Sequence, residues 1–266
     1  MDLELTGKVA IVSGGSRGIG KEAARALVAE GVDVAITARD MAVATDAAAE
    51  LARDSGRKVQ AFASDTGKDE AVRGAVAAIV KAFGRVDILV NSAANPASQA
   101  QAPKLADITN EPFFDEMNVK GMGYLRMARE VAPHMKRQGW GRIINISGLN
   151  ARLSGNIIGS IRNVGVAALT KNLADELGSS GIGVTCIHPG LTRTKKTPAM
   201  LQRQAKAAGI TPEEQERRIT SRIVIGRMPT AAEIGHIVAF LASPKSAAIN
   251  GDAIAAGGGT PGSIYY

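Results

Sequence analysis

Three glycines near the amino terminus have the spacing of a phosphate-binding turn. The stretch "VAIVSGGSRGIGKEAARALVAEG" reads as a strand, a turn and a helix, with Gly14, Gly18 and Gly20 in the turn. Gly14 lets the chain leave the strand, Gly18 lets backbone approach a pyrophosphate, and Gly20 lets the helix pack closely on a sheet. The start of the helix adds unpaired N–H groups and a positive dipole end. The turn therefore predicts a dinucleotide site, which also includes Ser16, Arg17 and Ile19.

The end of the next strand indicates which dinucleotide is bound. A site for NAD uses a carboxylate there to accept a ribose hydroxyl. Here "VAITARD" places Ala38 at that position and Arg39 after it, and Arg17 lies within the glycine turn. Two cations suit a 2′-phosphate, so NADP(H) is favoured. Asp40 is close enough to keep NAD(H) as the alternative cofactor.

Alternating strands and helices must position these residues. Short apolar, β-branched runs predict strands at Val9–Val12, Val32–Thr37, Val59–Ser64, Ile88–Asn91, Arg142–Ile146, Val184–His188 and Ile254–Ala256. Longer stretches between them predict helices at 19–30, 42–54, 68–82, 113–138, 156–178 and 231–241. Repetition of strand, helix and strand gives right-handed crossovers and a doubly wound parallel sheet. No Pro/Ser-rich linker or repeat interrupts residues 1–266, so we expect a single α/β domain.

Composition excludes several classes of protein. Hydrophobic residues make up 45% of the chain and aromatic residues only 3%, which favours an aliphatic core of helices packed on a buried sheet. The one cysteine, Cys186, excludes an internal disulfide and a cysteine-rich zinc site, and no metal site is expected. The start of the chain does not resemble a signal peptide, and no apolar run approaches the ~20 residues that span a bilayer. We expect a cytoplasmic protein with no membrane partner.

Positive charge concentrates in one segment. Between Arg193 and Arg227 there are nine Lys or Arg against three Glu, a net charge of +6 out of +7 for the chain. The run Thr211–Glu214 has the residues of a helix start, which places a small helix there. The segment is interpreted either as a solvated surface or as a basic lid, at about 192–225, over an anionic substrate such as a phosphate-bearing acyl carrier. It lacks aromatic residues for base stacking, so no nucleic acid is expected.

Motifs along nearly the whole chain resemble the short-chain dehydrogenase/reductase family, especially its ketoreductase-like members. They are "SGGSRGIG", "SDT", "DILVNSAA", "NVKG", "GRIINIS", "HPGLTRT" and "IGRMPTAAEIGHIVAFLAS". The resemblance implies a Rossmann-type fold of about seven strands with helices on both faces. It also implies hydride transfer between NAD(P)H and a carbonyl or alcohol of a small molecule, and a homodimer or homotetramer.

The resemblance also implies further contacts to the cofactor. Asp65 would contact adenine, and residues near the nicotinamide would follow the sixth strand. The positions implied are Asp65, Thr66, Asn91, Ala93, Ala94, Pro189, Gly190 and Thr194.

The departures from the family pattern lie where its chemistry is done. The family uses a Ser and then Tyr-x-x-x-Lys on a helix, with a supporting Asn. Ungapped comparison through "ALTKNLADELG" places Gly159 at the Tyr position and Asn163 at the Lys position. None of the three tyrosines, Tyr124, Tyr265 and Tyr266, is followed four residues later by Lys. Glycine donates no side-chain proton and asparagine does not titrate, so ordinary ketone reduction should be slow.

Parts of the catalytic group remain as candidates. Gly148 takes the position of the family's Ser, and Ser147 lies one residue earlier. Asn118 stands at the supporting Asn position, where a structural role in a helix is the alternative. Asn163 keeps the capacity to hydrogen-bond the nicotinamide ribose.

Other groups are considered as substitute proton donors. His188 titrates near neutrality in its ordinary state and ends a strand that borders the crevice, although it also fits a structural role. Arg162 stays protonated and is expected to point away from the Asn163 face, so it suits oxyanion stabilisation. Tyr265 and Tyr266 end the chain and would act only from a neighbouring subunit.

Three functions stay open at this point. The first is an NADP(H)-dependent oxidoreductase with a non-standard proton donor, acting on a small carbonyl or an anionic acyl substrate. The second is a catalytically silent binding or regulatory protein of the same fold. The third is a non-redox enzyme, such as a lyase, hydrolase or isomerase, that uses the same crevice.

Overall fold

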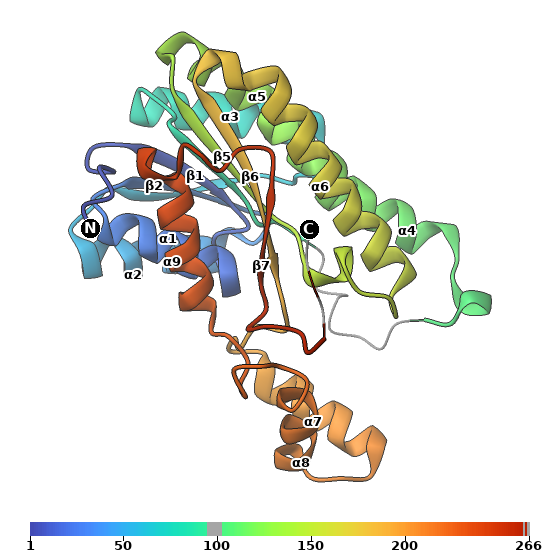
Figure 1. Cartoon of the computed structure of the whole chain (residues 1–266). Coiled ribbons are helices and arrows are strands. Elements are labelled where there is room, and N and C mark those ends of the chain that lie inside the picture. The colour runs from blue at the N-terminus through green and yellow to red at the C-terminus, as the bar shows by residue number, and fades with distance from the viewer. Residues whose placement is uncertain (95–102, 263, 265–266) are drawn as a thin grey trace.

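A computed structural model describes residues 1–94, 103–262 and 264 and is built on one parallel sheet. The strand order is β3-β2-β1-β4-β5-β6-β7. The strands are β1 (Val9–Ser13), β2 (Asp33–Ala38), β3 (Val59–Ala63), β4 (Ile88–Asn91), β5 (Gly141–Ile146), β6 (Ile182–Pro189) and β7 (Ala253–Ala256). The predicted doubly wound sheet is therefore confirmed (Figure 1). The order reverses between β1 and β4, where open α/β sheets bind ligands beyond the strand ends.

Helices cover both faces of the sheet. The helices of the described residues are α1 (Gly18–Ala29), α2 (Met41–Ser55), α3 (Asp69–Phe83), α4 (Asn110–Glu116), α5 (Gly123–Gln138), α6 (Ile157–Leu177), α7 (Thr197–Ala208), α8 (Pro212–Thr220) and α9 (Ala231–Ala242). Helices α1, α2 and α9 bury apolar side chains on one face, and α3, α5 and α6 do so on the other (Figure 1). Among the described helices, none is both long and apolar enough to cross a membrane.

Successive residues of the central strand β1 point alternately into the two hydrophobic cores. Ala10 and Val12 of β1 pack with α1, whereas Ile11 points into the core beneath α3 and α5. This is the alternation that a strand imposes, and both faces are apolar because helices cover both. Small aliphatic side chains suffice for these thin layers, which explains the low aromatic content.

The predicted helix 113–138 is divided into three parts. Helix α4 ends at Glu116, a π-helical turn spans Met117–Met122, and α5 continues to Gln138. The wide turn is held from outside by Arg126, whose guanidinium donates to the carbonyls of Thr66 and Asn118 at 3.1 and 3.0 Å. Such a turn changes which residues face inward without ending the helix, and π-turns are frequent at functional sites.

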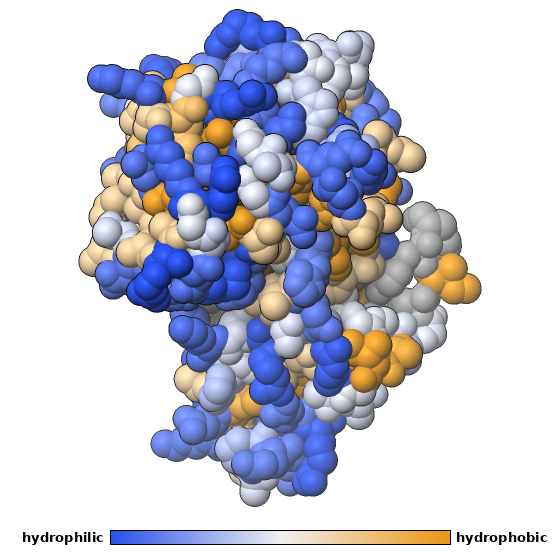
Figure 2. All heavy atoms as spheres, turned by 90° about the vertical axis from the view of Figure 1, so that its left-hand side faces the viewer, coloured by the Kyte–Doolittle hydropathy of each residue, from blue (hydrophilic) through white to orange (hydrophobic). Residues whose placement is uncertain are grey.

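The basic segment leaves the sheet after β6. It forms α7 and α8, which lie beyond the carboxyl ends of the strands (Figure 1). A small apolar cluster packs Ile219 of α8 against Met200 and Leu201 of α7, together with Met228 after α8. Many hydrophilic side chains cover the outside of this excursion, with smaller apolar areas between them (Figure 2).

Candidate functional site

A cleft of about 1800 Å³ lies at the carboxyl edge of the sheet. The glycine turn forms one wall, the ends of β2, β4, β5 and β6 form the floor, and α8 borders the other side. Most residues expected at the site line it: Gly14, Ser16, Arg17, Gly18, Ile19, Gly20, Arg39, Thr66, Ala93, Ala94, Ser147, Asn163, Pro189, Gly190 and Thr194.

The glycine turn has the shape of a phosphate cradle. Gly14 and Gly18 have positive φ angles of 70° and 56°. A Cβ atom on Gly14 would lie 2.8 Å from the backbone of Ala93, and one on Gly20 would lie 2.4 Å from the Gly14 carbonyl oxygen. No side chain caps the start of α1, where Arg17 is the N-cap residue. Its first N–H groups are thus available to an anion, and the turn fits the pyrophosphate of a dinucleotide.

Charged side chains gather where the adenosine ribose of such a cofactor would lie. Arg17 Nη2 is 2.9 Å from Asp40 Oδ2, and the other Asp40 oxygen accepts from Val43 N at the start of α2. The sequence leaves Asp40 as an alternative acceptor of the ribose hydroxyl. Here its carboxylate already takes part in one ion pair and one helix-capping hydrogen bond. Arg39 is exposed, lines the cleft and has no ion pair within the described part of the chain. In this arrangement Asp40 is engaged, whereas the Arg39 cation is available to the ribose.

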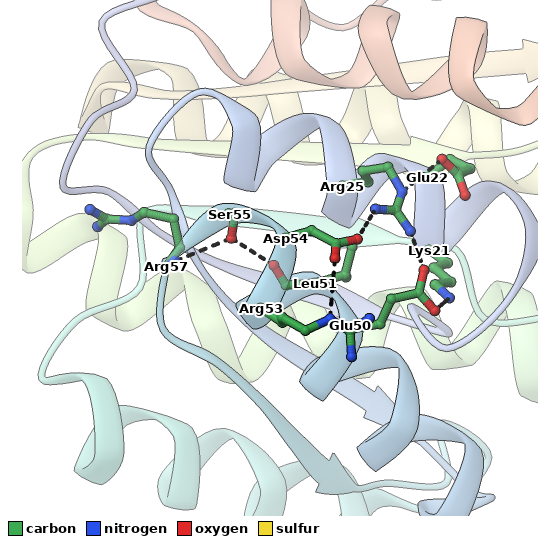
Figure 3. Close-up of polar contacts among 9 residues, drawn as sticks. All are labelled: Lys21, Glu22, Arg25, Glu50, Leu51, Arg53, Asp54, Ser55 and Arg57. Atoms are coloured by element: carbon green, nitrogen blue, oxygen red, sulfur yellow. Dashed lines mark hydrogen bonds and ion pairs between the residues drawn. The ribbon is translucent and has the colours of Figure 1, made fainter.

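An ion network fixes the two helices beside this end of the cleft (Figure 3). Arg25 of α1 contacts both Glu50 and Asp54 of α2, and Lys21 lies 2.7 Å from Glu50. Hydrogen bonds from Lys21 and then Arg25 hold the pKa of Glu50 below its ordinary value. The network keeps the start of α1 in a fixed position relative to β2 and α2.

Some expected contact residues support the cleft from outside its wall. Ser13, Asn91 and Asn145 stand in register on β1, β4 and β5. Asn91 Nδ2 donates to Asn145 Oδ1 at 2.9 Å, and Asn145 in turn donates to Thr170 Oγ1 at 2.9 Å. This buried chain joins the central strands to α6 and occupies the Asn91 amide.

The loop after β3 is held in a similar way. Asp65 Oδ1 accepts from Gly67 N at 3.0 Å, and Asn118 Nδ2 donates to Gly67 O at 3.2 Å. Neither Asp65 nor Asn118 lies on the cleft wall, whereas Thr66 between Asp65 and Gly67 does. The Asn118 amide thus ties the π-helical turn to the loop after β3.

Gly159, which ungapped comparison places at the family's Tyr position, lies under a helix cap. Gly159 is buried in the first turn of α6, and its N–H donates to Asn156 Oδ1 at 2.8 Å. A Cβ atom on Gly159 would lie 2.9 Å from the Asn156 carboxamide carbon. Gly159 does not line the cleft, so the space beside it belongs to the Asn156 cap.

A buried lysine contacts Asn163, the residue that ungapped comparison places at the family's Lys position. Lys120, from the π-helical turn, is only 5% exposed and lines the cleft. Its Nζ donates to Ser147 O at 2.8 Å and to Asn163 Oδ1 at 3.1 Å. Ser147 Oγ donates to the Asn163 carbonyl at 3.0 Å, which links the end of β5 to α6.

Sequence reasoning missed Lys120, although a signal was present. Lys120, Tyr124, Met127 and Val131 follow helical spacing, and all four are buried. Lysine is rarely fully buried without a partner, so a lysine within an apolar helical face indicates a buried interaction. Burial, and next the charge of Arg162, lower the pKa of Lys120 to about 7.

The structure corrects the expectation for Arg162. It was expected to point away from the Asn163 face, but its side chain is buried and lines the same cleft. Arg162 Nη1 lies 2.5 Å from Glu116 Oε2, and Arg162 Nε has no hydrogen-bond partner. The physical reason is the Glu116 carboxylate at the end of α4, because the Arg162 guanidinium turns toward it to form the ion pair.

The surroundings of His188 disfavour its charged form. Burial, then the charges of Arg152 and Lys120, lower the pKa of His188 to about 4. Its Nδ1 lies 3.8 Å from Cys186 Sγ, and His188 does not line the cleft. The imidazole is therefore neutral at physiological pH, and burial raises the pKa of the Cys186 thiol to about 11.

Among the described residues, no tyrosine hydroxyl is free to donate a proton to a substrate. The Tyr124 hydroxyl donates to Ile146 O at 2.9 Å, and burial raises its pKa above the ordinary value. Tyr265 and Tyr266 lie outside the described residues.

Known proteins resemble this chain over nearly its full length. Residues 14–260 match the family described as enoyl-(acyl carrier protein) reductase. The chain is 33% identical over 254 residues to the short-chain reductase protein NovJ of Streptomyces niveus, covering 95% of this chain and 94% of that one.

Solved structures show the same arrangement. L-sorbose reductase from Gluconobacter frateurii, complexed with NADPH and L-sorbose, matches with a TM-score of 0.93, 27% identity and coverage of 99% of this chain and 100% of that one. A variant of actinorhodin polyketide ketoreductase with NADPH matches with a TM-score of 0.88, 30% identity and coverage of 96% and 98%. Sequence, sheet order and cleft together show that this chain belongs to the short-chain dehydrogenase/reductase family of oxidoreductases.

Proposed function

We propose that this protein transfers a hydride between NADP(H) and a carbonyl or hydroxyl group of a small molecule. The observation that carries the proposal is the uncapped start of α1 behind Gly14 and Gly18, facing a cleft that also holds Arg39. Bound there, the nicotinamide supplies the hydride, and the protein holds and orients the reactants. L-sorbose reductase and the actinorhodin ketoreductase are NADPH complexes, whereas a xylitol dehydrogenase of similar fold is bound to NAD⁺. The choice of NADP(H) over NAD(H) therefore rests on Arg39 and on the engaged Asp40 carboxylate.

The proposal includes a non-standard catalytic group. Gly159 and Asn163 stand where the family has its Tyr and Lys, and neither donates a proton from a titrating side chain. Ser147 keeps a hydroxyl on the cleft wall, and Asn163 keeps an amide for the nicotinamide ribose. The neutral, enclosed His188 is set aside as the acid.

The basic segment supports an anionic substrate. Arg193 pairs with Glu216 and Arg218 pairs with Glu214. Three other cations of this segment line the cleft and have no ion pair with any described residue: Lys195, Lys196 and Arg222. Unpaired cations around a cleft attract carboxylates, phosphates and phosphate-bearing acyl carriers. We propose that residues 192–225 form a lid over the substrate within a single domain.

Cofactor binding tests the first part of the proposal. Titration of the purified protein with NADPH and NADH, followed by nucleotide fluorescence, should show tighter binding of NADPH. Gly18→Ala should greatly weaken that binding, because a side chain at φ 56° enters the phosphate cradle. Gly84→Ala is the matched control, since Gly84 also has a positive φ of 79° but lies at the end of α3.

Both variants should lose about 1–2 kcal/mol of folding stability from backbone strain. Only Gly18→Ala should lose affinity for NADPH. Equal affinity of the two variants, or no binding by the wild type, would contradict the proposed cofactor site.

A panel of carbonyl substrates tests the second part. NADPH oxidation is measured with L-sorbose, a β-keto ester and an acetoacetyl thioester, at several pH values. Turnover of any of these supports the oxidoreductase. Tight NADPH binding without any turnover would instead favour the catalytically silent protein, for which Gly159 and Asn163 are the specific observation.

A further inference from the structure

Lys120 brings an ammonium group to Asn163, the residue that ungapped comparison places at the family's Lys position. The Lys120 side chain comes from the π-helical turn, and its Nζ contacts the Asn163 side chain and the carbonyl that ends β5. An ammonium has three N–H donors. The two hydrogen bonds use two of them and leave one for a molecule in the cleft that Lys120 lines.

The residues around Lys120 are shaped to receive it. A Cβ atom on Gly148 would lie 2.8 Å from Asn163 Nδ2, so glycine there leaves room for the amide. Asn163 turns its Oδ1 toward Lys120 and thereby accepts from the ammonium. Gly148, Asn163 and Lys120 are therefore a mutually consistent set, in which a lysine from one helix reaches a neutral acceptor on another.

We propose that Lys120 is the general acid and base of the hydride-transfer reaction, in place of the family's tyrosine. The assignment rests on the proposed function and concerns which side chain moves the proton. During reduction, the carbonyl carbon accepts the hydride, the π electrons move to oxygen, and Lys120 gives its proton to that oxygen. The Lys120 N–H bond breaks as the O–H bond forms, and the neutral amine regains a proton from water in the cleft.

The surroundings of Lys120 suit a proton that leaves near neutrality. Burial and the Arg162 guanidinium favour the neutral amine, whereas Glu116 and Cys186 oppose them more weakly. The charged and titratable groups that face it from the packed elements are Glu116, Tyr124, Arg162, Cys186 and His188. Tyr124 and Cys186 stay protonated and His188 stays neutral at pH 7, which leaves Lys120 as the group that titrates there.

The direction of the pH dependence follows from this assignment. The acid form of Lys120 prevails below a pKa of about 7. The kcat for carbonyl reduction should therefore fall as pH rises through about 7, and the kcat for alcohol oxidation should rise over the same range. A phenol with an ordinary pKa near 10 would not produce this midpoint.

Three variants separate proton transfer from cofactor binding. Lys120→Met removes the ammonium, Lys120→Arg keeps a cation that does not readily give up its proton, and Lys136→Met changes an exposed lysine of α5 as the control. Lys120→Met and Lys120→Arg should each lower kcat by about 10²- to 10⁴-fold and abolish the pH midpoint near 7. Both should still bind NADPH, measured by fluorescence, and Lys136→Met should match the wild type.

A second readout does not depend on turnover. Protein labelled with ¹⁵N-lysine is titrated with and without NADP⁺, and the Nζ resonance of Lys120 is assigned by its loss in Lys120→Arg. We expect a midpoint near 7 that moves when NADP⁺ binds. An Nζ midpoint near 10.4, the ordinary value for lysine, would overturn the assignment.

Failure of the assignment and failure of the proposed function give different results. An active wild type whose Lys120→Met variant keeps its kcat and pH profile overturns the role of Lys120 and leaves the oxidoreductase standing. A wild type that binds NADPH but oxidises it with no carbonyl of the panel overturns both.

Discussion

At the scale of single residues, ungapped comparison with the family pattern predicts a coordinated exchange at the site. The resemblance implies a lysine on the helix equivalent to α6, and the comparison places Asn163 at that position. Lys120 reaches Asn163 from the π-helical turn, and Gly148 leaves space for the amide between them. Because each change makes room for another, restoring one family residue alone should disturb the rest.

We therefore expect the double variant Gly159→Tyr with Asn163→Lys to gain no activity. The tyrosine must displace the Asn156 side chain, whose loss as a helix cap costs about 1 kcal/mol. The new lysine would bring a second ammonium beside Lys120, and like charges in a buried site repel strongly. Adding Lys120→Leu should remove that repulsion.

The measurement compares kcat with NADPH for the wild type, the double variant and the triple variant. NADPH affinity and melting temperature report whether each variant folds. Higher activity of the triple variant than of the double variant supports the coordinated exchange. A double variant that exceeds the wild type severalfold, with Lys120 in place, would show that the two sets of residues are independent.

At the scale of elements, sequence predicted the sheet well and the local breaks in helices poorly. Apolar β-branched runs located all seven strands, because the central strands β1, β4 and β5 are buried on both faces and the outer ones keep an apolar pattern. The predicted helix 113–138 concealed the π-helical turn, since one extra residue in a turn leaves almost no trace in a 3.6-residue period. Helix α7 was not predicted, although Pro198 lies at its start.

The same limit explains which site residues were found. The glycine turn is local in sequence, so its place on the cleft wall could be predicted from one segment. Lys120 and Asn163 are far apart in the chain and meet only because the π-helical turn packs against α6. Arg162 was misplaced for the same reason, because its direction depends on Glu116 of α4.

The packing of α9 on α1 gives a prediction at this scale. A Cβ atom on Gly235 of α9 would lie 2.6 Å from the Glu22 carbonyl oxygen of α1. Since that neighbour is helix backbone, Gly235→Ala should push the helices apart and lower the free energy of unfolding by about 1–3 kcal/mol. Displacement of α1 should also weaken NADPH binding.

Gly74→Ala in α3 is the matched control. No atom outside its own helix lies within 4 Å of the added Cβ, and the residue is exposed. Alanine in a helix interior is favoured over glycine by about 0.5–1 kcal/mol, so this variant should be more stable than the wild type. Denaturant unfolding measures both changes, and a Gly235→Ala protein as stable as Gly74→Ala would refute the close approach.

At the scale of the whole molecule, the outer surface of α6 carries several exposed apolar side chains. Ile157, Ile161 and Val164 of α6 are 47%, 46% and 51% exposed. Their spacing of four and three residues places them on one face of the helix. Phe114 of α4 and Met122 of the π-helical turn are also exposed, and α4 packs against α6. Contiguous apolar surface of this kind is typical of an interface.

We expect this α6 stripe to join two copies of the chain, in agreement with the homodimer or homotetramer implied by family resemblance. A two-fold axis across the stripe would bring the same three side chains together from both copies and bury them.

Ile161→Glu should then convert the oligomer to a smaller species, because a carboxylate at the interface would be desolvated without a partner. The control is Ala49→Glu, which adds the same charge at an exposed position of α2, on the other face of the sheet. Light scattering coupled to size-exclusion chromatography measures the mass of each protein. An unchanged mass for Ile161→Glu, or an equal change in Ala49→Glu, would place the interface elsewhere. Because Arg162 follows Ile161 directly and lines the cleft, loss of the oligomer should also reduce kcat if α6 depends on its partner for its position.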